Sequence, residues 1–220
     1  MGLRGDDMML LTRRQLVGTS LLGAAGLAAP ALAGVEPTIP MQLGPFYPVA
    51  HKGEIDSDMA QLAGQAQPAK GDIIEVMGRV LGPDGRPVAG ARLDIWQANA
   101  AGRYAHKGDD NAAPLDPGFQ GFAVLKTDAE GRYRVRTVRP GIYPAGNYKR
   151  AAHIHFSVDG QNDRLITQMY FADDPWLSQD RTLLYDLDSK GPPWPKQIFG
   201  QEHKLAGSTH YMFDIVLAFG

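Results

Sequence analysis

The chain has 220 residues, of which 44% are hydrophobic and 21% charged, the profile of one globular domain. Its 26 glycines and 16 prolines favour a turn-rich β architecture over a helix bundle. The formal net charge of −2 provides no basic surface for nucleic acid, and the lack of cysteine excludes disulfides, thiolate metal sites and cysteine nucleophiles.

The first segment of the chain has the features of an export signal. Twin arginines, Arg13 and Arg14, precede an uncharged apolar run that ends in the small-residue motif Ala31-Leu32-Ala33. These features predict a twin-arginine signal peptide over residues 1–33, a mature domain over residues 34–220 and a periplasmic location. The alternative is a transmembrane anchor. The run is short for a membrane span and stops at a cleavage motif, so no stable span is expected after processing.

The mature chain predicts short strands separated by turns. Residues 34–70 are expected to be irregular, because they are interrupted by glycine and proline. Residues 127–131 are expected to join two of the strands as a hairpin. The predicted strands are Ile73–Leu81, Ala91–Gln97, Phe122–Lys126, Arg132–Thr137, His153–Val158, Leu165–Phe171 and Tyr211–Phe219. No stretch has a sustained helical period, so we expect an all-β sandwich with an irregular N-terminal arm and long loops.

His153 and His155 are candidate metal ligands. Residues i and i+2 of a strand point to the same face, so the two imidazoles project together while Ile154 faces the core. A shared metal and a pair of ordinary hydrogen-bonded histidines are both compatible with this pattern. Without cysteine or an adjacent acidic residue, a thiolate zinc site and the facial triad of iron(II) oxygenases are disfavoured. Tyr104 and Tyr143 offer phenolate oxygens, which are hard donors that suit iron(III).

Five motifs follow one another along the middle of the chain. They are Trp96–Asn99, Gly102–Tyr104, Pro140–Pro144, Arg150–Phe156 and Leu165–Gln168. In order and spacing, they resemble the intradiol ring-cleavage dioxygenases, especially the protocatechuate 3,4-dioxygenase-like branch, over about residues 44–171. The resemblance implies a β-sandwich that holds one iron(III), with the ligands Tyr104, Tyr143, His153 and His155.

The resemblance also implies an activity. The enzyme would cleave a catechol-type ring between its two hydroxyls with O2 and release a cis,cis-muconate-type product. Its partners would be a small aromatic diol and O2, and the chain would associate as a homo-oligomer. Tyr143 would accept a proton from the diol, Arg150 would stabilise negative charge on the ring, and Gln168 would lie beside it. We interpret Trp96 as a core residue.

The chain departs from the family pattern near the second tyrosine. The interval from Tyr143 to His153 is short, Ala145 replaces a usual aromatic residue and Ala151 replaces a usual proline. We therefore expect a substrate pocket that is more open than in protocatechuate-specific relatives. The sequence does not identify which diol is the substrate. Tyr148 is a rival to Tyr143 as a ligand.

Two other classes of function stay open. Residues 78–99 also resemble transthyretin-like and carboxypeptidase-regulatory-like binding modules, which would need no metal site. A hydrolytic zinc enzyme could use the same two histidines and would be colourless. His106 could compete as a ligand, and we interpret it, with His51, His203 and His210, as an ordinary polar residue.

Overall fold

The computed structural model describes residues 35–189, 191–205 and 207–219, so the predicted signal peptide lies outside the described residues. The strands are β1 (Ile73–Leu81), β2 (Arg92–Trp96), β3 (Phe122–Lys126), β4 (Arg132–Val138), β5 (Tyr143–Ala145), β6 (Tyr148–Arg150), β7 (His153–Asp159), β8 (Arg164–Tyr170), β9 (Gln201–Leu205), β10 (Ser208–Met212) and β11 (Ile215–Val216). The helical segments are η1 (Leu177–Gln179), α1 (Arg181–Asp186) and η2 (Lys196–Ile198).

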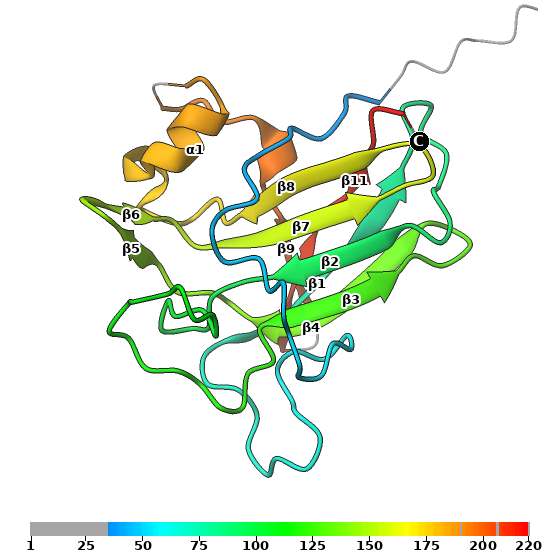
Figure 1. Ribbon diagram of the computed structural model, residues 1–220. Helices are drawn as coiled ribbons and strands as arrows, with labels where there is room; N and C mark the ends of the chain where they lie inside the picture. The colour runs from blue at the N-terminus through cyan, green and yellow to red at the C-terminus, as the bar shows by residue number, and fades with distance from the viewer. Residues whose placement is uncertain (1–34, 190, 206, 220) are drawn as a thin grey trace, which may run out of the picture. The chain divides into compact units, whose positions relative to one another are not determined.

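Two sheets form the layers of a β-sandwich, which confirms the predicted fold class (Figure 1). One sheet has the order β3-β2-β7-β8, and all of its pairs are antiparallel. In the other sheet, β1 pairs with β4 on one side and, on its other side, with β10 and then β11. β5 and β6 form a separate hairpin beside α1 (Figure 1).

The core between the sheets follows from the alternation of side chains along each strand. On β7, Ile154, Phe156 and Val158 are fully buried in the main hydrophobic cluster, as predicted. On β1, Ile74 and Val76 enter the same cluster. The intervening residues of β7 point to the opposite face of their sheet. This alternation directs both candidate histidines out of the core and toward a separate layer of loops.

The predicted hairpin at residues 127–131 is wrong. β3 pairs with β2 and β4 pairs with β1, so this turn crosses from one sheet to the other. The Thr127 hydroxyl donates to the Val88 carbonyl at 2.7 Å and accepts from the Ala91 amide at 2.9 Å. These bonds tie the end of β3 to the approach to β2, while the Gly131 carbonyl accepts from Val80 of β1 at 2.8 Å.

The predicted strand Tyr211–Phe219 is divided into β10 and β11. Between them, the Phe213 amide donates to the Met77 carbonyl at 2.8 Å, and the Asp214 carboxylate accepts from the Arg79 amide at 2.8 Å. A Cβ on Gly78 would lie only 2.1 Å from the Phe213 carbonyl oxygen. Glycine at residue 78 is therefore what allows the two segments to approach at this break.

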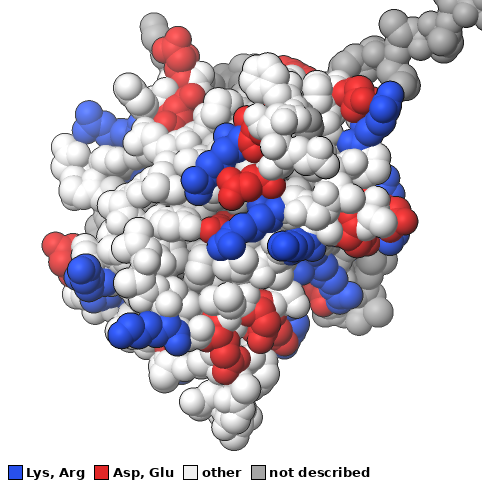
Figure 2. All heavy atoms as spheres, turned by 45° about the vertical axis from the view of Figure 1, so that its right-hand side comes forward, with Lys and Arg blue, Asp and Glu red and all other residues white. Residues whose placement is uncertain are grey.

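Charged side chains of both signs are mixed on the surface. In the face that Figure 2 shows, lysine and arginine side chains are interspersed with aspartate and glutamate, in keeping with the formal net charge of −2. None of the helices within the described ranges has the length and apolar character needed to cross a membrane.

Candidate metal centre

The two histidines at the start of β7 converge on one point. Their Nε2 atoms lie 3.1 Å apart, and the ring centroids are separated by 4.7 Å. The Nδ1 of His153 lies 2.6 Å from the Ala151 carbonyl oxygen. Because a carbonyl only accepts hydrogen bonds, this Nδ1 carries the proton, and Nε2 is left with the free lone pair. The ring of His153 is thus fixed in the tautomer that binds a metal through Nε2.

Both predicted tyrosine ligands join the histidines. The Tyr143 hydroxyl lies 3.4 Å from the His153 Nε2, and the rings of Tyr104 and Tyr143 meet edge to face at 5.4 Å. The side chains are almost completely enclosed, with exposed fractions of 3% for Tyr104, 6% for Tyr143, 1% for His153 and 2% for His155. The Tyr104 hydroxyl has no hydrogen-bond partner among the described residues. An enclosed hydroxyl without a partner is costly, and a cation ligand would satisfy it.

The electrostatics of these four residues, hereafter the tetrad, suit a hard cation. Burial lowers the pKa of both histidines, and the nearby Arg150 guanidinium lowers each pKa further, so both rings are neutral, as metal ligation requires. Burial raises the pKa of both tyrosines. A bound cation reverses this effect, because it stabilises a phenolate. Two neutral nitrogen donors and two ionisable oxygen donors thus fit one hard cation.

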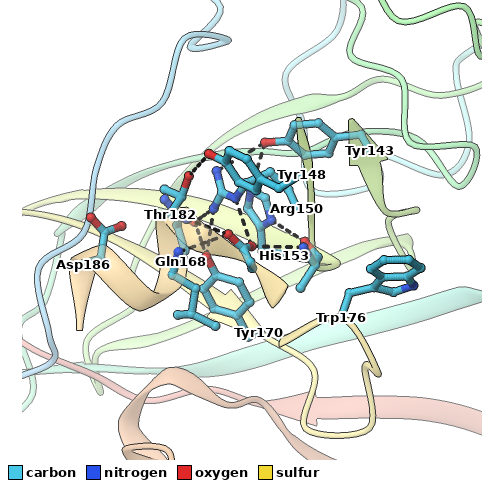
Figure 3. Close-up of polar contacts among 12 residues, drawn as sticks. Tyr143, Tyr148, Arg150, His153, Gln168, Tyr170, Trp176, Thr182 and Asp186 are labelled. Carbon is cyan, nitrogen blue, oxygen red and sulfur yellow. Dashed lines mark hydrogen bonds and ion pairs between the residues drawn. The ribbon is translucent and has the colours of Figure 1, made fainter. Parts of the chain in front are cut away.

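A short hairpin places the second tyrosine. Tyr143 of β5 is the cross-strand partner of Arg150 of β6, and Gly146 in the turn has a φ of 65°. The short interval between Tyr143 and His153 is this hairpin. Tyr148 is the partner of Ala145 instead, and its hydroxyl is directed to the Thr182 Oγ1, 2.5 Å away (Figure 3). The structure therefore brings Tyr143, and not its rival Tyr148, to the histidines.

Tyr104 is held by the loop that follows β2. The Asn99 side-chain oxygen accepts from the amides of Ala101 and Arg103 at 2.9 and 3.0 Å. The Tyr104 amide then donates to the Asp109 carboxylate at 2.7 Å. These hydrogen bonds fix the first turn of the loop, which directs the tyrosine back toward β7.

Arg150 and Gln168 lie in a buried polar network beside the tetrad (Figure 3). The Arg150 Nη2 donates to the Gln168 Oε1 at 2.7 Å and to the Tyr170 hydroxyl at 2.8 Å. Its Nη1 faces the Tyr143 hydroxyl at 3.5 Å, and its Nε donates to Asp180 at 2.9 Å. Neither Tyr170 nor Asp180 was predicted as a site residue from the sequence. Tyr170 could have been found from its place two residues after Gln168 on the same strand face.

Trp96 packs against a candidate ligand as well as filling space. It is the cross-strand partner of His155, and the two rings stack with centroids 4.7 Å apart and an angle of 7° between their planes. The interpretation of Trp96 as a buried packing residue holds, since it is 1% exposed. The stack also restricts the rotation of the His155 ring.

The irregular arm at residues 35–48 covers the tetrad. Its Thr38 amide donates to the Val216 carbonyl of β11 at 3.0 Å, and its Met41 amide donates to the Ile166 carbonyl of β8 at 2.8 Å. Further along, the Phe46 ring lies 4.7 Å from the Tyr104 ring. A cavity of about 20 Å³ lies beside Phe46 and Tyr104, on the side of Phe122, and neither Tyr143 nor the two histidines of the tetrad line it. That is room for about one water, so this cavity is not a substrate pocket, and the openness of the pocket beside the tetrad stays a prediction.

The other histidines do not join the tetrad. The His106 Nδ1 accepts from the Gly108 amide at 3.1 Å, and the His51 Nε2 contacts the Glu54 carbonyl oxygen at 2.9 Å. His203 and His210 are cross-strand partners in the other sheet. Within the described ranges, no group of three or more histidine, aspartate or glutamate side chains could hold a metal.

Comparison with known proteins identifies the family. A family model described as dioxygenase matches residues 43–218. The protocatechuate 3,4-dioxygenase beta chain of Burkholderia cepacia is 48% identical over 144 residues, which cover 63% of this chain and 61% of that protein. The 6-chlorohydroxyquinol 1,2-dioxygenase of Cupriavidus pinatubonensis is 34% identical over 190 residues, which cover 80% of this chain and 63% of that protein.

A solved structure has the same fold. The dioxygenase domain of a dioxygenase and carbohydrate-binding protein fusion from Streptomyces sp. SirexAA-E superposes with a TM-score of 0.64 at 24% identity, over 84% of this chain and 100% of that one. The chain spans less than two thirds of each of the two curated relatives, at 61% and 63% of their lengths. The family model covers residues 43–218, which is most of the length of the chain. The chain therefore belongs to the intradiol dioxygenase family.

Proposed function

We propose that this chain is an iron(III) enzyme that cleaves a catechol-type ring between its two hydroxyls with O2 and gives a cis,cis-muconate-type product. The observation that carries the proposal is the enclosed tetrad, in which two Nε2 atoms 3.1 Å apart share a site with the unpartnered hydroxyl of Tyr104. The names of the two curated relatives, a protocatechuate 3,4-dioxygenase beta chain and a 6-chlorohydroxyquinol 1,2-dioxygenase, support a role in aromatic catabolism.

When bound by the tetrad, iron(III) would supply Lewis-acid activation of the diol. The chain's own residues would bind and orient the substrate and handle its protons. Tyr143 would accept one proton from the diol on its Oη atom. Arg150 would stabilise negative charge on the ring. Burial alone would lower the pKa of Arg150, but Tyr170, Tyr143 and Asp180 around it raise that pKa above its ordinary value, so the guanidinium stays charged.

The neighbouring residues would orient and enclose the reactants. Gln168, 0% exposed, holds the Arg150 Nη2 on one side and donates to the Gln42 carbonyl of the arm at 2.8 Å on the other. The arm would exclude water through Phe46. Because the side chains of the tetrad are at most 6% exposed, the arm would have to yield when a diol enters. The proposed partners are a small aromatic diol and O2.

Two further features belong to this proposal. The chain would act as a homo-oligomer, and it would be exported to the periplasm by the twin-arginine route with loss of residues 1–33. A twin-arginine route carries folded proteins, so the metal could be inserted before export.

Metal analysis and absorption spectroscopy of the purified protein test the proposal. We expect about one iron per chain, a visible tyrosinate-to-iron charge-transfer band, and consumption of one O2 for each ring cleaved. Catechol, protocatechuate and a bulky catechol should be compared. A colourless protein that contains stoichiometric zinc and is inactive after iron loading would support the hydrolytic alternative. A protein that retains no metal would support a binding module.

A further inference from the structure

The connection between β8 and β9 places a fully buried carboxylate against the residues that precede His153. Asp180 is 0% exposed and lies at the start of α1. Its Oδ2 accepts from the Arg150 Nε at 2.9 Å and from the Ala151 amide at 3.0 Å. Its Oδ1 accepts from the amides of Thr182 and Leu183, each at 3.0 Å. Four donors therefore hold this carboxylate, and its position is set by the helix.

The carboxylate determines how the guanidinium of Arg150 lies. A guanidinium is a planar fork with its donors in fixed directions. Asp180 takes the Nε, while Gln168 and Tyr170 take the Nη2 at 2.7 and 2.8 Å. With these contacts made, the remaining Nη1 faces the Tyr143 hydroxyl at 3.5 Å. Loss of the contact at Nε would leave the fork held only through Nη2, about which its plane can tilt.

We propose that Asp180 is a positioning residue for the ring-cleavage reaction, which acts by fixing the plane of the Arg150 guanidinium so that Nη1 is directed at the Tyr143 hydroxyl. The proposal rests on the proposed function. Its physical basis is preorganisation: a donor stabilises developing charge only when it is already aimed at the place where the charge forms.

The chain allows this role to be separated from a merely structural one. Asp180 also accepts the Ala151 amide, and a proline at residue 151 would remove that bond while leaving the contact between Asp180 and Arg150. Ala151→Pro is therefore a matched control, and the intradiol sequences that this chain resembles usually have proline there. A second control is the background in which the arginine is absent, because Asp180 cannot act through a residue that has been removed.

The experiment is a double-mutant cycle on the iron-loaded protein with catechol as substrate. Asp180→Asn keeps the shape but leaves an amide facing the Arg150 donors. We expect kcat to fall by roughly 10- to 100-fold with iron content preserved, as when one preorganised donor is lost or misdirected. In the Arg150→Ala background, the same substitution should change kcat by less than about 2-fold. Ala151→Pro, which keeps the carbonyl that contacts His153, should lower kcat clearly less than Asp180→Asn does. Equal losses from Asp180→Asn in both backgrounds, or a loss in Ala151→Pro as large as that in Asp180→Asn, would overturn the proposal.

A second measurement does not depend on activity. In the metal-free protein with nitrogen-labelled arginine, the Arg150 Nε–H should give a slowly exchanging NMR signal, since it is buried and bonded to a carboxylate. We expect this protection to be lost in Asp180→Asn and kept in Ala151→Pro. If the wild-type protein holds iron but cleaves no diol, the proposed function fails, and this signal still decides whether Asp180 fixes Arg150. If Asp180→Asn does not fold, Arg150→Lys, which keeps the charge but not the plane, should show the same loss of kcat. Full activity in Arg150→Lys would then contradict the proposal.

Discussion

Tyr104→Phe should raise the stability of the metal-free protein and lower the ability of the protein to hold metal. The Tyr104 side chain is 3% exposed, and its hydroxyl has no partner among the described residues. A buried polar group without a partner costs about 1–3 kcal/mol. Removing only this oxygen should therefore raise the free energy of unfolding of the metal-free protein by about 1–3 kcal/mol. The same change removes a ligand, so iron retention should fall and the charge-transfer band should shift or disappear.

Urea unfolding of chelator-treated protein measures the first effect, and metal content with visible absorption measures the second. Tyr143→Phe is the matched control, because the Tyr143 hydroxyl has neighbours at 3.4 Å in His153 and 3.5 Å in Arg150. That variant should lose iron binding without gaining stability. The reasoning would be refuted by a metal-free Tyr104→Phe protein less stable than the wild type, or by one that binds iron with an unchanged spectrum.

Four other outcomes are expected. Arg150→Ala should lower turnover on the order of 100-fold with near-normal iron content, and steady-state kinetics that match the wild type would contradict its role. Phe46→Ala should raise kcat/KM for a bulky catechol relative to catechol by about 10-fold, since the Phe46 ring packs over Tyr104 and Tyr143 at centroid distances of 4.7 and 6.2 Å; an unchanged ratio would show that the arm does not limit access. The hydrogen bond from Arg134 holds the pKa of Glu75 below its ordinary value of 4.5. The ionised carboxylate therefore stabilises the fold fully above pH 4.5, and this stabilisation is lost as the pH falls through the lowered pKa. Urea unfolding across this range should show a smaller acid loss in Glu75→Gln than in the wild type. Replacing both arginines of the predicted signal by lysine should retain the precursor in the cytoplasm, as fractionation would show, whereas unaffected export would contradict the prediction.

The sequence predicted those parts of the fold that depend on local alternation. The period of two around His153 and His155 indicates which side chains share a face, and the structure places Ile154 and Phe156 in the core as expected. Alternation does not specify which strand lies beside which, so the hairpin at residues 127–131 was predicted wrongly. The partners of those strands are chosen by distant contacts such as that between Val80 and Gly131.

The candidate metal site, like the fold, was predictable from the sequence only in part. The histidine pair follows from strand geometry, but joining Tyr104 and Tyr143 to it required the resemblance to a family. Asp180 could not be found, because it lies 27 residues after His153 in a connection without periodic pattern. Its only local signature is that of a helix N-cap, a position that aspartate occupies in many proteins without any further role. Only the folded chain shows that the cap also holds an arginine.

The anchoring of the arm bears on when the site can mature. The arm that covers the tetrad is held at Thr38 by a pair of hydrogen bonds with Val216, at 3.0 Å between the Thr38 amide and the Val216 carbonyl and 2.9 Å between the Val216 amide and the Thr38 hydroxyl. Val216 lies in β11, which the ribosome makes after every ligand of the tetrad. During synthesis the four ligands therefore emerge before the strand that anchors their cover. A cation that arrives early would meet an arm held only by its contacts with β8, and one that arrives late would have to pass beneath the fully anchored arm. In the proposed metal enzyme, insertion of the cation would thus be coupled to the final stage of chain folding.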